Sequence, residues 1–168
     1  MAETDRALIV YETMFGNTER IARAIRDGLR QYVPAETVPV NRAPDVVPGD
    51  VRLLVVGGPT HAFSMSTGST RDSARQQGAT RIPARGIREW LGELASPASP
   101  IGVATFDTRT VHPRLPGSAA KKALKQLVAK GFRPVDKAHT FGVHGYSGPI
   151  ADGELDQARE WGASLVDA

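Results

Sequence analysis

Two hydrophobic patterns alternate along this chain. Short runs of consecutive apolar residues, rich in β-branched side chains, are typical of strands buried on both faces of a parallel sheet. Between them, apolar residues recur every three or four positions, as on one face of an amphipathic helix. The predicted strands are Arg6–Glu12, Glu36–Val40, Val51–Pro59, Ile101–Asp107 and His139–Gly145. The predicted helices are Ile21 to about Arg30, Arg85–Leu94, Ser118–Gly131 and Ala151–Val166.

Strands that alternate with helices form βα units, which build parallel sheets. We therefore predict an α/β fold, a doubly wound sheet of five parallel strands with helices on both faces, in one domain spanning residues 1–168. Pro39 cannot donate a ladder hydrogen bond, which favours an edge position for Glu36–Val40. With right-handed crossovers, this edge strand favours the strand order 2-1-3-4-5.

One segment, Thr60–Ala84, carries neither pattern. It is long, polar and rich in Arg, Ser, Thr and Gly, so we predict a loop, either functional or solvated and flexible. If it is functional, Arg71, Arg75 and Arg81 are candidates for selecting an anionic substrate near the ligand site.

Ligands of such sheets bind beyond the carboxyl ends of the strands, where the strand order reverses. For the order 2-1-3-4-5 this crevice lies between the first and third strands. Three segments that each follow an apolar strand should meet there: Thr13–Thr18, Gly58–Ser66 and Phe106–Val111.

The first of these segments, "TMFGNT", has the composition of an anion-binding turn. Gly16 lets the backbone approach a ligand, and the N–H groups that open the following helix point at it, at the positive end of the helix dipole. The segment has neither the lysine-containing pattern of a P-loop nor the glycine spacing of a dinucleotide-binding fold. The alternative is an ordinary strand-to-helix turn in which Asn17 or Thr18 caps the helix.

These segments resemble the ligand-binding loops of flavodoxins. "TMFGNT" is similar to the flavodoxin phosphate loop, Thr/Ser-x-Thr-Gly-x-Thr, which holds the phosphate of flavin mononucleotide (FMN). "GGPTHAF" and "ATFDTR" stand where the second and third flavin-binding loops of that family lie. More narrowly, the chain resembles an actinobacterial-type flavodoxin-domain protein.

The resemblance implies a flavodoxin-like fold with FMN as the cofactor, and it assigns candidate cofactor-binding residues on all three loops. In the first loop, the residues that match phosphate-binding positions are Thr13, Gly16, Asn17 and Thr18, and Met14 and Phe15 would contribute backbone N–H groups. In the other two loops, the residues would face the isoalloxazine ring. The ring-facing positions are Pro59, Thr60, His61 and Phe63 in the second loop, and Phe106, Asp107 and Thr108 in the third.

Two features depart from the flavodoxin pattern. Phe15 replaces a hydroxyl residue, and the loss of one hydrogen bond to a phosphate dianion weakens binding by roughly 1.5–3 kcal/mol. The Trp and Tyr that usually sandwich the flavin ring are also missing. Trp90 and Trp161 lie at core positions of predicted helices, which leaves Phe63 and Phe106 as the best candidates for stacking. His61 is a further candidate, for stacking or for a hydrogen bond.

Composition narrows the chemistry further. The sequence has no cysteine, so disulfides and thiol chemistry are excluded, and its four histidines lack the spacing of a metal site. Its start lacks the basic and apolar regions of a signal peptide, and no run is long and apolar enough to span a membrane. We expect a cytoplasmic protein. The formal net charge of +3 is spread along the chain, so we expect neither a nucleic-acid nor a membrane partner.

Two functions remain open. The first is an FMN-binding redox protein, either an electron carrier or a small flavin reductase, whose partner is a redox protein or a small-molecule acceptor. The second is a flavodoxin-fold protein that has lost FMN and serves as an interaction module. The sequence pattern leaves open whether the protein is an enzyme, and also its oligomeric state.

Overall fold

The computed structural model describes residues 5–60, 64–79, 82–111, 117–145 and 147–167. Within them, a parallel sheet has the order β2-β1-β3-β4, and β5 and β6 both pair with the free side of β4. Together β5 and β6 take the place of one interrupted fifth strand, so the predicted order 2-1-3-4-5 is confirmed. The strands are β1 (Arg6–Tyr11), β2 (Ala35–Pro39), β3 (Val51–Pro59), β4 (Gly102–Thr110), β5 (Arg133–Pro134) and β6 (His139–Val143).

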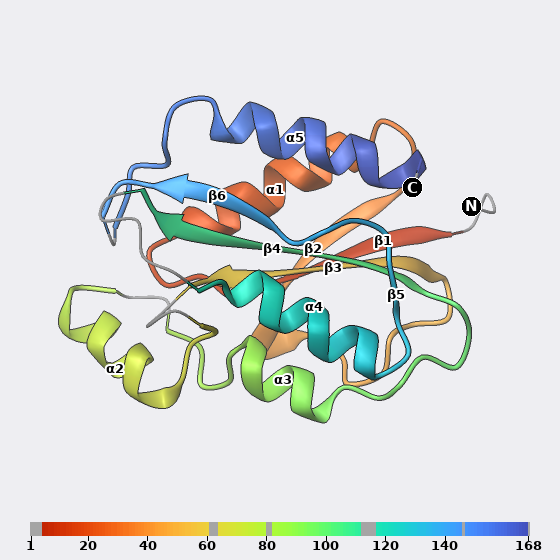
Figure 1. Ribbon diagram of the computed structural model, residues 1–168, viewed down its shortest axis with the longest axis horizontal. Coiled ribbons are helices and arrows are strands. Elements are labelled where there is room, and N and C mark those ends of the chain that lie inside the picture. Colours follow the sequence, from red (N-terminus) through yellow and green to blue (C-terminus); the bar gives the residue numbers. More distant parts are fainter. Residues whose placement is uncertain (1–4, 61–63, 80–81, 112–116, 146, 168) are drawn as a thin grey trace.

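Helices cover both faces of the sheet (Figure 1). One face is covered by α1 and α5, and the other by α3 and α4, so that each side of the sheet has its own apolar core. The helices are α1 (Asn17–Leu29), α2 (Gly68–Gln76), α3 (Ile87–Glu93), α4 (Ala119–Ala129) and α5 (Glu154–Ser164). Short 3-10 turns are η1 (Val40–Arg42) and η2 (Leu165–Asp167).

Both tryptophans are core residues, as their helical spacing predicts. Trp90 on α3 is completely buried, and its indole N–H donates to the Pro44 carbonyl. Trp161 on α5 packs edge-on against Phe106 and Phe141, with ring centroids 6.2 and 5.9 Å away. Each tryptophan therefore holds one helical layer onto the sheet.

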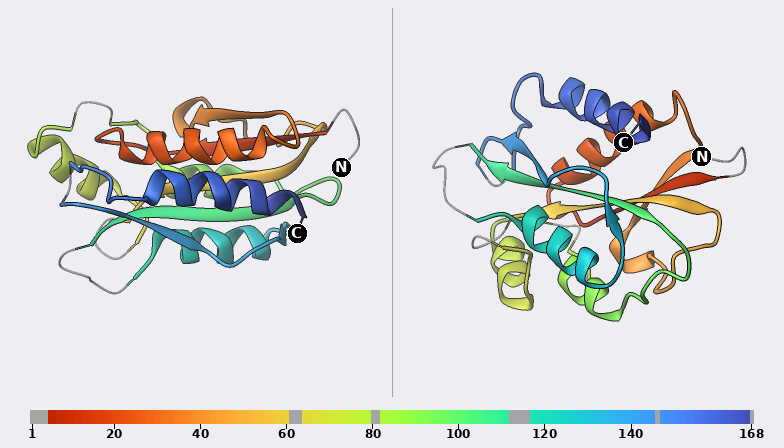
Figure 2. Two further views of the ribbon diagram at one scale, coloured as in Figure 1. Left: turned by 90° about the horizontal axis from the view of Figure 1, so that it is seen from above. Right: turned by 45° about the vertical axis from the view of Figure 1, so that its right-hand side comes forward.

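The segment Thr60–Ala84 corrects the sequence prediction, because it contains the helix α2. Thr67 caps this helix in a reciprocal pair with Thr70, whose backbone N–H donates to the Thr67 hydroxyl. Only Ala74 and Arg71 of this helix are buried, so it shows no large apolar stripe. Figures 1 and 2 place α2 beyond the carboxyl ends of the strands, where the ligand-binding loops lie.

The described part of the chain contains neither a membrane-spanning helix nor a cluster of metal-binding side chains. None of its helices has the length and apolar character needed to cross a bilayer. Nor do its His, Asp and Glu side chains gather into a group that could hold a metal ion.

Candidate functional site

The turn from β1 into α1 is built around Gly16. This residue is the N-cap of α1 and has φ +92°, in the left-handed region that favours glycine. Its N–H donates to the Thr13 hydroxyl over 3.0 Å, which closes the turn. The sequence predicts a turn that needs glycine at this position, and the positive φ of Gly16 is the reason for that need.

The start of α1 leaves hydrogen-bond donors available to a ligand. No side chain caps this end of the helix, and its first backbone hydrogen bond runs from Arg20 to Gly16. The N–H groups of Asn17 and Thr18 precede that bond and so have no acceptor within the helix. Among the described residues, a Cβ built on Gly16 would meet no atom within 4 Å beyond its chain neighbours, so the space beside Gly16 is open. Open space, free donors and the helix dipole fit an anion such as a phosphate.

Two contacts fix this turn to other segments. The Thr18 and Thr108 hydroxyls are 2.8 Å apart and buried, which joins the start of α1 to the end of β4. The Asn17 side chain lies against Gly148, because a Cβ built there would be 2.8 Å from the Asn17 Oδ1. Thr18 therefore offers a ligand its backbone N–H, while its hydroxyl holds the turn in place.

Phe15 has a packing role that the sequence did not suggest. Met14 is buried with Ala74 and Ala79 in a small apolar cluster, and Phe15 and Ile82 pack against it. The side chain that replaces a phosphate-binding hydroxyl thus holds the α2 segment against the first loop. What we interpreted as a loss in ligand binding is also a gain in packing.

The second and third loops meet at the start of α4. Asp107 is completely buried, and its Oδ2 accepts hydrogen bonds from the hydroxyls of Thr60 and Ser118 and from the N–H of Ala120. Thr60 also accepts from the N–H of Ala119. The Asp107 carboxyl group therefore occupies this helix N-terminus, and within the described residues its Oδ1 has no hydrogen-bond partner.

This arrangement corrects the roles expected for the third loop. The Phe106 ring is 1 % exposed and fills the space beside Gly57, where a Cβ would lie 2.0 Å from the ring. Phe106 therefore belongs to the core and is not placed to stack on a ligand. The side chains of Asp107 and Thr108 are buried too, and hold the loops together instead of facing outward.

The structure describes only one of the other candidate cofactor-binding residues of the second loop. Pro59 ends β3 and is half-buried at the carboxyl edge of the sheet, beside the Thr60 hydroxyl described above. His61 and Phe63 lie outside the described residues.

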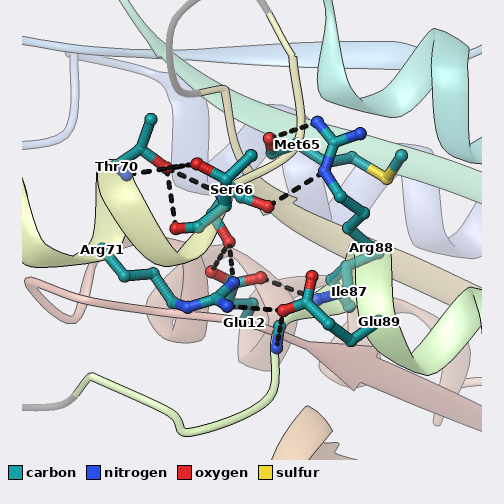
Figure 3. A network of polar contacts seen from close by, with 10 residues as sticks. Glu12, Met65, Ser66, Thr70, Arg71, Ile87, Arg88 and Glu89 are labelled. Carbon is teal, nitrogen blue, oxygen red and sulfur yellow. Dashed lines mark hydrogen bonds and ion pairs between the residues drawn. The ribbon is translucent and has the colours of Figure 1, made fainter.

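A buried polar network behind the first loop was missed by the sequence analysis (Figure 3). Glu12 is 2 % exposed; its Oε1 accepts from the N–H of Ile87 over 2.8 Å and its Oε2 from the Ser66 hydroxyl over 2.5 Å. Arg71 donates to the same Ser66 hydroxyl and forms an ion pair with Glu89 at 2.6 Å. The network joins the end of β1 to α2 and α3.

Burial has the largest influence on the pKa of Glu12. Loss of solvent raises the pKa of this carboxyl group, against the opposing effects of the hydrogen bonds from Ser66 and Ile87 and of the nearby Arg71 charge. A charged residue directly after an apolar strand was the available signal, but its partners are more than 50 positions away along the chain.

Comparison with solved structures identifies the fold. No protein-family model and no curated protein matches the sequence. Flavodoxin 2 from Bacillus cereus superposes with a TM-score of 0.70 at 16 % identity, over 96 % of this chain and 98 % of that one. A Streptococcus pneumonia flavodoxin gives 0.69 at 14 % identity, over 96 % and 98 % of the two chains. A WrbA-like flavodoxin from Agrobacterium tumefaciens gives 0.60 at 15 % identity, over 97 % and 96 %. The chain has a flavodoxin-like fold, as the sequence predicts.

Proposed function

We propose that the protein binds FMN at the first loop and acts as a redox protein of the flavodoxin class. The observation that carries this proposal is the open, uncapped start of α1 behind Gly16, whose φ of +92° and free surroundings suit a phosphate. The flavodoxin-like fold adds weight, since ligands of such sheets bind beside this turn. Fold alone would not decide the function.

The residues divide into those that bind and those that support. The N–H groups of Asn17 and Thr18 would hold the terminal phosphate, together with the dipole of α1. The bond between Thr18 and Thr108 would keep the loop in position. Bound FMN would supply one-electron or two-electron transfer, chemistry that this cysteine-free chain does not provide itself.

The second candidate is a flavodoxin-fold protein without FMN that serves as a binding module. One observation favours it: Phe106, expected to stack on the ring, is packed in the core. A flavin held by its phosphate but not sandwiched by aromatic rings would bind more weakly than in a carrier with both contacts.

An FMN titration tests the proposal. We expect apo-protein to quench FMN fluorescence with saturation below about 100 μM, and to bind flavin adenine dinucleotide less tightly because the loop closes around a terminal phosphate. No quenching or spectral shift in this range would contradict FMN binding and favour the binding module. The electron partner, a redox protein or a small-molecule acceptor in the cytoplasm, is then sought only for the flavin-loaded protein.

Gly16→Val supplies the matched variant. A branched side chain at φ +92° is strained, and it would occupy the space in front of the N–H donors, so we expect FMN binding to be abolished while the fold is retained. Gly49→Val is the control, because Gly49 is exposed in the loop before β3 and a Cβ there meets nothing within 4 Å. FMN binding that survives Gly16→Val would exclude the first loop as the phosphate site.

A further inference from the structure

A cleft of ≈ 470 Å³ opens on the side of the first loop that faces away from β3. It lies at the carboxyl ends of β1 and β2, between the first turns of α1, the start of η1 and the segment that follows α2. Its volume falls within the range of small-molecule sites, roughly 300–1,000 Å³. The cleft lies on the β2 side of β1 and shares Thr13 with the first loop, but its other lining residues are not among the candidate FMN-binding residues.

Four charged residues line the cleft, the acids Glu12 and Glu19 and the bases Arg23 and Arg42, and they differ in whether they have a partner. Tyr11 donates its hydroxyl hydrogen to Glu19 over 2.8 Å, and Arg23 lies 3.4 Å from the other oxygen of Glu19. Glu19 is therefore engaged twice within the cleft wall. Glu12 also reaches the cleft, but both of its carboxylate oxygens accept hydrogen bonds inside the buried network. The acidic groups of the cleft are thus already occupied.

Arg42 is the cation that remains. It is exposed on η1, and within the part of the chain that the structure describes it has neither an ion pair nor a hydrogen bond. Arg42 and Arg23 both favour ionisation of Tyr11, so both charges reach the Tyr11 hydroxyl across the cleft. Burial and Glu19 outweigh them and raise the pKa of Tyr11 to about 12, so the phenol stays neutral. Among the described residues that line the cleft, Arg42 is therefore the guanidinium without a polar partner, and one such group suits a monoanion.

Four apolar residues also line the cleft, beside the polar Thr13 and Asn41. They are Pro39, Val40, Ile82 and Pro83, and three of the four are only partly buried. Partly exposed apolar side chains in the same cleft as the guanidinium of Arg42 suit a ligand with one charged end and an apolar body. The planar guanidinium matches a carboxylate through two parallel hydrogen bonds.

We propose that this cleft binds a small organic carboxylate, whose charged group pairs with Arg42 and whose apolar body lies against Ile82 and Pro83. The site goes beyond the proposed FMN function and does not depend on it. Because Thr13 lines the cleft and also closes the Gly16 turn, a ligand there would touch the first loop from behind.

An NMR titration of the isotope-labelled chain tests this site with two matched probe pairs. The probes are benzoate and hexanoate, each compared with its neutral alcohol, benzyl alcohol or hexanol, at up to about 10 mM, where a millimolar site is near saturation. We expect both carboxylates, and neither alcohol, to shift the amide signals of Asn41, Arg42 and Ile82 in a saturable way. Arg42→Gln should weaken carboxylate binding about tenfold, the value of one charge-assisted hydrogen bond pair.

Arg26→Gln is the control variant, because Arg26 lies on the same helix as Arg23 but pairs with Asp27 outside the cleft. It should leave the affinity unchanged. Any one of three results would overturn the proposal: no shift at these amides with either carboxylate, equal binding of acid and alcohol, or equal weakening by both variants. Shifts confined to Gly16, Asn17 and Thr18 would also overturn it, because they would place the anion at the proposed phosphate loop instead.

Discussion

At the scale of single residues, Glu12 makes stability depend on pH. Burial raises its pKa, so the folded protein keeps this proton to a higher pH than the unfolded chain does. The Glu12 contribution to stability is therefore greatest below the unfolded pKa of about 4.3, and it falls as the pH rises through the raised folded pKa. Ionising the buried carboxyl group costs free energy in the folded protein, whereas the solvated carboxyl group of the unfolded chain ionises without this cost.

Glu12→Gln isolates this effect. We expect the free energy of unfolding of the variant, relative to that of the wild type, to increase as the pH rises from about 4 to about 8. Urea unfolding at several pH values measures it, with Glu160→Gln, an exposed change on α5, as the control for loss of one carboxylate. A difference that is the same at every pH would show that Glu12 does not titrate differently in the two states.

Phe15 shows where reasoning from single residues stops. The sequence predicts the turn at Gly16 correctly, because a strand, a glycine and a helix that follow one another define it locally. It gives no sign that Phe15 packs with Ala74 and Ala79, since those contacts bring together positions some sixty residues apart. One residue that departs from a motif can therefore remove a hydrogen bond to the ligand and at the same time add a packing contact to the fold.

At the scale of elements, α2 is held by a buried ion pair instead of an apolar stripe. Arg71 is 7 % exposed and pairs with Glu89 of α3, which is 34 % exposed on its side chain. Removal of one partner leaves the other charge without compensation. Because Glu89 is partly solvated, we expect Arg71→Ala to lower the free energy of unfolding by roughly 2–3 kcal/mol, less than for a fully buried pair.

The same helix offers the matched control. Arg75 pairs with Asp72 at 2.8 Å, but both side chains are more than half exposed, so Arg75→Ala should change stability by only about 0–1 kcal/mol. Hydrogen exchange should show faster opening at positions 68–79 in the Arg71 variant and wild-type rates in the Arg75 variant. Equal protection of α2 in both variants would mean that the apolar cluster with Met14 holds the helix alone.

The sequence missed α2 for an identifiable physical reason. Helices that pack on the sheet have large apolar residues every three or four positions, and this pattern can be recognised in the sequence. The helices α1, α3, α4 and α5 were therefore all predicted within a few residues of their observed bounds. By contrast, α2 buries an alanine and an arginine. Its start depends on Thr67 and Thr70, a capping pair in which threonine stands where Glu or Gln is usual.

The contact between α1 and α5 depends on two glycines. A Cβ built on Gly162 would lie 2.3 Å from the Ile25 carbonyl oxygen, and one on Gly28 would lie 2.0 Å from that of Arg159. Gly162→Ala must therefore push the helices apart, at a cost of about 1–3 kcal/mol in the free energy of unfolding. Gly92→Ala on α3, where a Cβ meets nothing within 4 Å, should instead stabilise by about 0.5–1 kcal/mol. Urea unfolding of both variants measures the contrast, and a stabilising Gly162→Ala would contradict this packing.

At the scale of the whole molecule, the sequence predicts the arrangement of the sheet better than the site on it. The apolar runs predict the strands, and Pro39 predicts that β2 lies at an edge of the sheet, because both features reflect how each segment is buried. The orientation of the side chains at the strand ends depends on which face each residue takes. Phe106 and Asp107 lie within β4. Phe106 packs against Trp161 and Asp107 accepts at the start of α4, although both belong to a segment that resembles a flavin-binding loop.

Trp161 tests whether this core and the proposed FMN site are separate. Its ring packs with Phe106, Phe141 and His139 between α5 and the sheet, and its indole N–H donates to Asp136 over 2.9 Å. Trp161→Ala should lower the free energy of unfolding by about 3–5 kcal/mol, a large share of the 5–15 kcal/mol typical of a domain. Trp161→Phe keeps a ring in place and should cost less. Because none of these contacts involves the first loop, FMN affinity measured on the folded fraction should stay within a few-fold of the wild type in both variants. A folded Trp161→Ala variant that loses FMN binding would show instead that the aromatic core, through Phe106 and through Thr108 two positions further along β4, sets the geometry of the phosphate loop.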